Sequence, residues 1–164
     1  MGLSVHNGDL NVTGTLRVGA LSLPATCVVD ANVSGSSPLT AGKTRHRHAV
    51  TEAQAHGTAS VARRSAVRVA HAAGEVVAVR AGVSVACVGD STISVDVTKN
   101  GTTILSAPVG IDSGDLAFAL VAGVVSDAPY VAGDVFEVQV TVSAGTGTLG
   151  QGVFCDLVFD ELAG

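Results

Sequence analysis

The chain has 164 residues, of which 47% are hydrophobic and 14% are charged, and its formal net charge is −5. This acidic balance argues against nucleic acid as the main partner, because neutralising phosphates needs a basic surface. No apolar run approaches the roughly 18 to 20 residues that a membrane-spanning helix needs, so we expect a soluble protein without a membrane partner. Twenty Gly and no Trp leave Val, Ala and Leu to fill the interior, which favours β-strands joined by tight turns.

Short apolar pairs recur near the N-terminus between Gly-containing turns. We interpret them as short strands of a β-rich arm over residues 1–33, with apolar positions at Leu10, Val12, Leu16, Val18, Leu21 and Leu23. Repeats of this kind expose too much apolar surface for a monomer and commonly bury it against copies of themselves. One ordinary hairpin packed on its own domain is the alternative. The six residues are therefore the candidate oligomer or partner interface.

Residues 34–60 form the least regular part of the sequence. The stretch SGSSPLTAGKTRHRH at 34–48 has the Ser, Gly and Pro content of an exposed connector. The Ala-rich stretch that follows could form a short helical turn at 51–55, which Gly57 would end. We therefore predict a linker over residues 34–60.

Alternating apolar and polar residues predict a β-sandwich domain over residues 61–164. The clearest signal is a hairpin in which Asn100-Gly101 supplies the tight turn after a strand at 93–97. Further strands are expected at 67–69, 77–87, 116–120, 136–142 and 153–159, with a bulge or bend at Gly82. About seven or eight strands in roughly 100 residues predict an all-β antiparallel β-sandwich of jelly-roll or Greek-key topology.

One spacing raises a metal hypothesis. His46 and His48 would point to the same side of an extended strand, so three chains around an axis could offer their imidazoles to one octahedral ion. Needle-like phage spike tips hold iron in this way. The pair stands in a Gly/Ser/Pro-rich stretch with no carboxylate nearby in sequence, so surface or interface histidines are the favoured interpretation. No cofactor is expected.

Catalytic patterns are weak. Asp156 and Asp160 share a strand face, but outward acids are usually only solvated, although a glycosidase pair is conceivable. No serine lies in a Gly-x-Ser-x-Gly setting, and Cys27, Cys87 and Cys155 are widely spaced in apolar contexts. We expect free buried thiols, no secretory signal, synthesis in a reducing cytoplasm and no enzymatic activity.

Four segments resemble virion proteins of tailed bacteriophages: LNVTGTLRVGALSLP at 10–24, ISVDVTKNGTTIL at 93–105, VAGDVFEVQVTV at 131–142 and GVFCDLVFDEL at 152–162. The first is similar to the strand repeats of fibre and capsid-attached proteins, and the others are similar to small sandwich modules on phage heads and fibres. The resemblance implies a homotrimer whose N-terminal arm intertwines or lies along the shell while the sandwich projects outward.

Two roles compete within this resemblance. A head decoration protein would bind the major capsid protein at capsomer junctions on the virion surface, whereas a tail-fibre module would present its sandwich to host glycans. The short chain favours decoration, and the lack of Trp with a single Tyr counts against glycan recognition. A carbohydrate-binding module is the alternative outside the virion.

Overall fold

The structure is a computed structural model that describes residues 2–6, 9–13 and 45–162, and the chain divides into two compact units. The first unit contains an antiparallel hairpin of β1 (Gly2–His6) and β2 (Asp9–Thr13). β2 contains Leu10 and Val12, in agreement with the strand predicted there. Leu16, Val18, Leu21 and Leu23 lie outside the described residues.

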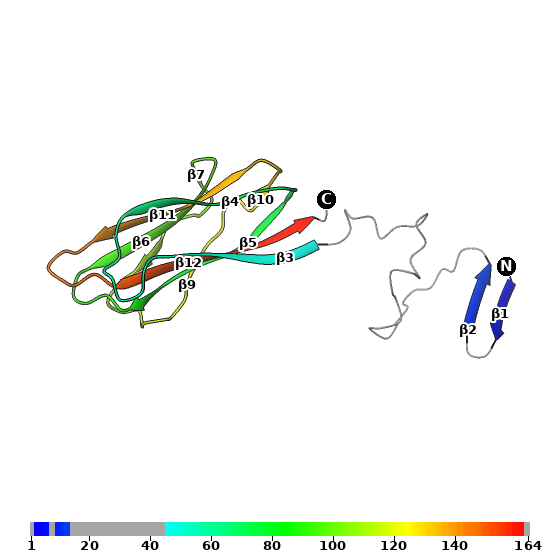
Figure 1. The fold of residues 1–164 in the computed structure, drawn as a ribbon, viewed down its shortest axis with the longest axis horizontal. Coiled ribbons are helices and arrows are strands. Elements are labelled where there is room, and N and C mark those ends of the chain that lie inside the picture. Colours follow the sequence, from blue (N-terminus) through cyan, green and yellow to red (C-terminus); the bar gives the residue numbers. More distant parts are fainter. Residues whose placement is uncertain (1, 7–8, 14–44, 163–164) are drawn as a thin grey trace. The chain divides into compact units, whose positions relative to one another are not determined.

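Strands of the second unit form a sandwich of two antiparallel sheets (Figure 1). Sheet I has the order β10-β5-β12-β3, with β9 also paired to β5, and consists of β3 (Arg45–Ala53), β5 (Gly74–Val85), β9 (Val121–Gly123), β10 (Pro129–Tyr130) and β12 (Gln151–Leu162). Sheet II has the order β4-β11-β6-β7, with β8 also paired to β6, and consists of β4 (Arg63–Val69), β6 (Thr92–Lys99), β7 (Thr102–Thr103), β8 (Val109–Ile111) and β11 (Val135–Ser143). The predicted all-β antiparallel sandwich is confirmed, and the jelly-roll topology stays a prediction.

The core lies between the two sheets and is built mostly from Val, Ile and Leu. Alternate residues of the long strands point inward, so each strand contributes one buried row to the core. Three of the few aromatic side chains meet edge to face within it: Phe136 lies 5.1 Å from Phe159 and 5.4 Å from Tyr130 between ring centroids. All the described core residues belong to the second unit.

The turn between β6 and β7 forms as the sequence predicts. Asn100 and Gly101 have φ values of 52° and 85°, and Lys99 pairs with Thr102 directly across the turn. Positive φ at both central positions matches the right-handed twist of the flanking strands. The Asn100 side chain also donates a 2.7 Å hydrogen bond to Asp134, which anchors the turn to the start of β11.

The linker predicted over residues 34–60 is wrong over residues 45–53, because these form β3. Its nine residues pair with β12 from Leu162↔Arg45 to Phe154↔Ala53, so the helical turn expected at 51–55 is also wrong. Local Ala content favours a helix, but the complete antiparallel ladder against β12 outweighs that preference. The sandwich therefore begins before residue 61.

Two other local predictions differ from the structure. Residues 116–120 form a loop instead of a strand, and the bulge lies elsewhere than at Gly82. Gly82 pairs regularly with Phe154, whereas the register shift of β12 against β5 falls between Val158 and Phe159. Gly82 serves a different purpose: a Cβ there would stand 2.5 Å from the carbonyl oxygen of Ala119.

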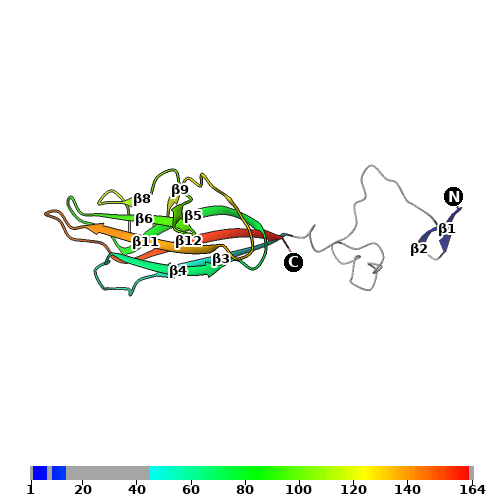
Figure 2. The ribbon, with the colours of Figure 1, turned by 90° about the horizontal axis from the view of Figure 1, so that it is seen from above.

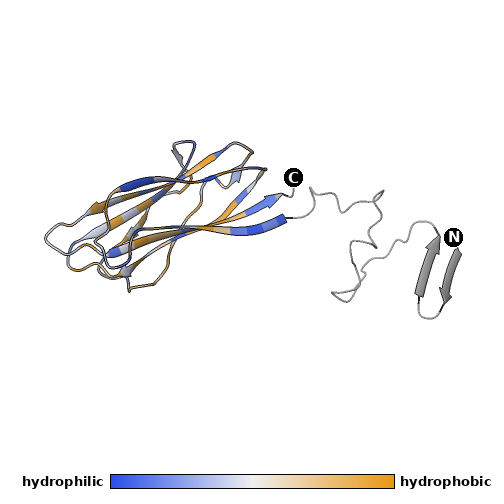
Figure 3. Cartoon of the chain, in the orientation of Figure 1, coloured by the Kyte–Doolittle hydropathy of each residue, from blue (hydrophilic) through white to orange (hydrophobic). Residues whose placement is uncertain are grey.

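The sandwich has two unlike poles. Arg45 at the start of β3 pairs with Leu162 at the end of β12, so the segment that precedes the sandwich joins it where β12 ends (Figures 1 and 2). Hydrophilic residues mark these strand ends in Figure 3. We call this the proximal pole. The distal pole, where β12 begins, carries the β3–β4, β5–β6 and β11–β12 connections.

Candidate functional site

The loop of residues 112–120 exposes three large apolar side chains near the distal pole. Leu116 is 76% exposed, Phe118 is 66% exposed and Leu120 is 49% exposed. We call these three residues the apolar loop surface. Apolar groups this exposed and this close in sequence mark an interaction site more often than isolated ones do.

Phe118 has an unusual backbone conformation for a bulky residue. The loop makes a turn closed by a 3.1 Å hydrogen bond from the N–H of Ala119 to the carbonyl of Leu116, and Phe118 is its third residue, with φ of 61°. Type II turns require positive φ at this position and prefer Gly or Asn there. Strained residues of this kind cluster at functional sites, so Phe118 is the first candidate contact residue.

The strained turn is held firmly on sheet I. The N–H of Phe118 donates a 2.8 Å hydrogen bond to the carbonyl of Val83, in the middle of a buried part of β5. Gly82 leaves room for the carbonyl of Ala119, and the ring of Phe154 covers the same glycine from the neighbouring strand. The loop is therefore pinned to the sheet while its large side chains remain in solvent.

Neighbouring groups give the apolar loop surface an acidic and aromatic border. The ring of His56 stacks on Phe118 with centroids 6.2 Å apart and planes at 29°. Asp112 and Asp115 stabilise the start of the loop, since Asp112 accepts a 2.7 Å hydrogen bond from the N–H of Gly114 and Asp115 accepts one of 3.0 Å from the N–H of Asp112. These acids serve as turn residues.

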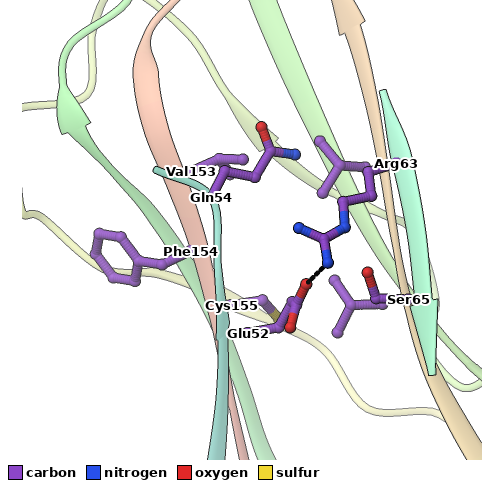
Figure 4. A pocket seen from close by; sticks show the side chains of 9 residues that line it. Glu52, Gln54, Arg63, Ser65, Val153, Phe154 and Cys155 are labelled. Carbon is purple, nitrogen blue, oxygen red and sulfur yellow. Dashed lines mark ion pairs between the residues drawn. The ribbon is translucent and has the colours of Figure 1, made fainter. Parts of the chain in front are cut away.

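The open side of the sandwich between β3 and β4 brings an acid, a base and a thiol close together (Figure 4). Glu52 and Arg63 form an ion pair of 3.3 Å across it, and Cys155 lies beneath them while Phe154 points to the other side of β12. The enclosed space measures about 10 Å³, which fits about one water molecule and no ligand. Burial raises the pKa of the Cys155 thiol to about 12, so it is not a nucleophile near neutral pH.

A polar network around Glu161 and Arg68 lies between β12 and β4, near the proximal pole. Glu161 accepts a 2.5 Å hydrogen bond from Arg68 and one of 2.9 Å from the N–H of Ala72. Burial alone would raise the pKa of Glu161, but these donors hold it below its ordinary value. The Arg68 guanidinium also lies 4.8 Å from the centroid of Phe159. This arrangement joins Glu161 on β12 of sheet I to Arg68 on β4 of sheet II.

The two candidate metal ligands lie on β3, where alternate residues share a side. His46 is exposed, whereas His48 is half-buried and stacks on Phe159 at 5.4 Å. The carboxylate missing from the local sequence comes from β12, since Glu161 lies 3.8 Å from Nε2 of His48. No group of three His, Cys, Asp or Glu side chains suited to a metal ion occurs among the described residues.

The outward carboxylates of β12 are engaged with basic and hydroxyl partners. Arg47 donates two 2.8 Å hydrogen bonds to Asp160, and this fork holds the pKa of Asp160 below its ordinary value. Asp156 accepts a 3.1 Å hydrogen bond from Thr51. Asp156 and Asp160 share a face of β12, as predicted. Asp160 forms an ion pair with Arg47 and therefore lacks the raised pKa of a general acid.

Sequence reasoning missed the apolar loop surface, because the alternation Leu-Ala-Phe-Ala-Leu at 116–120 looks like a strand. The predicted burial of Cys87 and Cys155 is confirmed, while Cys27 lies outside the described residues. Within residues 2–6, 9–13 and 45–162 there is no helix with the length and hydropathy that a membrane crossing requires. Neither a protein-family model nor a curated protein matches the sequence.

Proposed function

We propose that the protein is a non-enzymatic structural component of a tailed-phage virion that decorates the capsid as a homotrimer. In this proposal the N-terminal segment binds neighbouring copies and the major capsid protein at capsomer junctions, and the sandwich projects from the shell. The proposal includes synthesis in the host cytoplasm and residence on the capsid surface. It rests on the sequence resemblance together with one feature of the fold.

The feature that carries the proposal is the separation of the two poles. The first unit connects to the sandwich through β3, whose start lies beside the end of β12 at the proximal pole. The described core residues all lie between the two sheets of the sandwich, so attachment through the preceding segment does not require the core to open. A module held at one pole presents the opposite pole outward, as a decoration protein requires.

Attachment would be mechanical. Apolar burial contributes about 25 cal/mol per Å², so a contact of standard size repeated over a shell can stiffen it without any reaction. Three segments in one trimer would also bind as a multivalent ligand, which raises the apparent affinity far above that of a single segment. The residues we assign to this contact are Leu10, Val12, Leu16, Val18, Leu21 and Leu23.

The test is the double substitution L16D/V18D in the full chain. We expect trimer formation and binding to purified shells to be lost while the far-ultraviolet circular dichroism and the unfolding transition of the sandwich stay unchanged. The matched control is T141D/S143D, which adds the same charge at exposed positions of β11. Retained trimers and retained shell binding in L16D/V18D would contradict the proposal.

Phe118 favours a second candidate function, a tail-fibre module that recognises host glycans. An exposed aromatic ring stacked beside His56 on a rigid turn can pack against the apolar face of a sugar. The variant F118A separates the two functions on a glycan array. Glycan binding that disappears in F118A supports the receptor role, and an array without signal for the unmodified protein contradicts it.

A further inference from the structure

The two outer faces of the sandwich differ in chemistry. The outer face of sheet II is polar: Glu137 pairs with Arg64 and accepts from Thr98, and Asp96 accepts a 2.6 Å hydrogen bond from Thr103. The outer face of sheet I instead has a shallow hollow of about 560 Å³ whose apolar lining is small and aliphatic, formed by Ala49, Val77, Ala78 and Val158. Sheet I therefore presents apolar surface that the described residues of the sandwich leave uncovered.

The charges around this hollow are unlike those elsewhere on the sandwich. Every Lys and Arg between residues 45 and 162 forms an ion pair with another described residue except Arg80, which lines the hollow. Asp156 is the cross-strand neighbour of Arg80 and also has no ion pair among the described residues. Together with the Arg47–Asp160 and Arg45–Glu75 pairs, they give the face three positive and three negative charges among the described residues.

The edges of the sheets are poorly suited to joining copies by strand pairing. On one side β3 and β4 point charged or polar groups inward, with Glu52 and His48 on β3 and Arg68 on β4. On the other side the edges consist of β7, β8, β9 and β10, which have two or three residues each. Inward charges and very short strands are the devices that prevent edge-to-edge association. Contact between sandwiches is therefore expected to use side-chain surfaces, such as the outer face of sheet I, instead of edge pairing.

We infer that the outer face of sheet I is a contact surface for the same face of a second copy of this chain. A neutral surface with an unpaired cation beside an unpaired anion is complementary to itself, because Arg80 of one copy can meet Asp156 of the next under rotational symmetry. A strongly basic or acidic partner would leave one of the two charges facing its like. This contact lies on the sandwich itself and does not rest on attachment to a capsid.

Disulfide trapping in the full chain tests the inference. Val77 lines the hollow and is 39% exposed, so V77C in a C27S background places one accessible thiol on the face, since Cys87 and Cys155 are buried. We expect mild oxidation to give dimers on non-reducing gels. The control T141C puts the thiol on the exposed outer side of sheet II and should give few dimers.

Charge exchange identifies the partner of the face. Adding R80D or D156R to V77C should lower the dimer fraction about tenfold, because like charges then face each other. The double exchange R80D/D156R should restore it, and co-expression of the two single variants should restore it in part. Only a contact between copies gives rescue by mixing.

The outcomes separate this inference from the proposed function. V77C that stays unlinked in a protein that sediments as a trimer overturns the inference and leaves the proposed function standing. A dimer fraction of V77C that neither R80D nor D156R changes also overturns the inference. Efficient trapping with rescue by mixing, in a protein that binds no shell, supports the inference and counts against the decoration role.

Discussion

Replacing Phe118 with Gly should stabilise the protein relative to replacing it with Ala. Both variants lose the aromatic ring and its contact with His56, so that loss cancels in the comparison. They differ in the backbone, because Phe118 has φ of 61°, where an L-residue is strained and Gly is not. The comparison therefore measures the strain stored in the turn.

The size of the effect follows from two opposing contributions. A left-handed conformation costs a residue with a Cβ roughly 1 to 2 kcal/mol. The glycine variant loses about 0.5 to 1 kcal/mol of this advantage over alanine, because its unfolded chain has more conformational freedom to lose on folding. We therefore expect F118G to exceed F118A by about 0.5 to 1 kcal/mol in free energy of unfolding.

Urea unfolding at 25 °C, followed by circular dichroism, measures the difference. With an m-value of about 1.5 to 2 kcal/mol per M, the midpoint of F118G should lie roughly 0.3 to 0.6 M above that of F118A. Leu116 supplies the control, since it is exposed in the same turn without positive φ, and there L116G should be less stable than L116A. An F118G midpoint below that of F118A would refute the claim of strain.

Three other substitutions probe the core, the loop socket and the acid response. F136A should cost about 3 to 5 kcal/mol in calorimetric or urea unfolding, because the ring is fully buried and meets two other aromatic rings. G82A should expose the loop at 112–120 to limited proteolysis, because the new methyl group would meet the carbonyl of Ala119; unchanged cleavage would contradict the close approach. Asp134 accepts hydrogen bonds from the N–H of Val131 and from the side-chain amide of Asn100, and these lower its pKa. The ionised Asp134 therefore stabilises the fold fully above the unfolded pKa near 4, and this stabilisation is lost as pH falls through the lower folded pKa. In thermal melts, D134N should therefore be less stable than the unmodified protein at pH 7 and close to it at pH 2, and an equal deficit at both pH values would rule out this origin.

The parts of the fold that the sequence predicts well depend on neighbouring residues. Asn100 and Gly101 predict the hairpin because both tolerate positive φ, and the alternation of apolar and polar residues around Phe136 predicts β11. Strand β3 is different, because its inward His48 and Glu52 find partners on β12 and β4. Polar residues facing inward break the expected alternation, so the stretch reads as a connector.

The candidate site was harder to predict for a related reason. The sequence at 116–120 alternates like a strand, but the hydrogen bond from Phe118 to Val83 turns the chain away from strand geometry. Gly82 alone does not predict where the loop lies, because a glycine in a strand indicates either a bulge or a close backbone approach. Choosing between them needs the position of Ala119, which lies 37 residues further along the chain.

Protected edges and an uncovered face together restrict how this protein can assemble. A sandwich with open edges could form oligomers through backbone pairing alone, without a dedicated segment or a complementary surface. Here both long edge strands carry inward charges and the remaining edges are short, so backbone pairing offers little. Association then depends on side chains, and the candidates are the apolar N-terminal segment, the apolar loop surface and the surface around Arg80 and Asp156 on sheet I. If the N-terminal segments hold the copies together, they raise the local concentration of the faces, so a face too weak to join free copies would still pair two copies within the assembly.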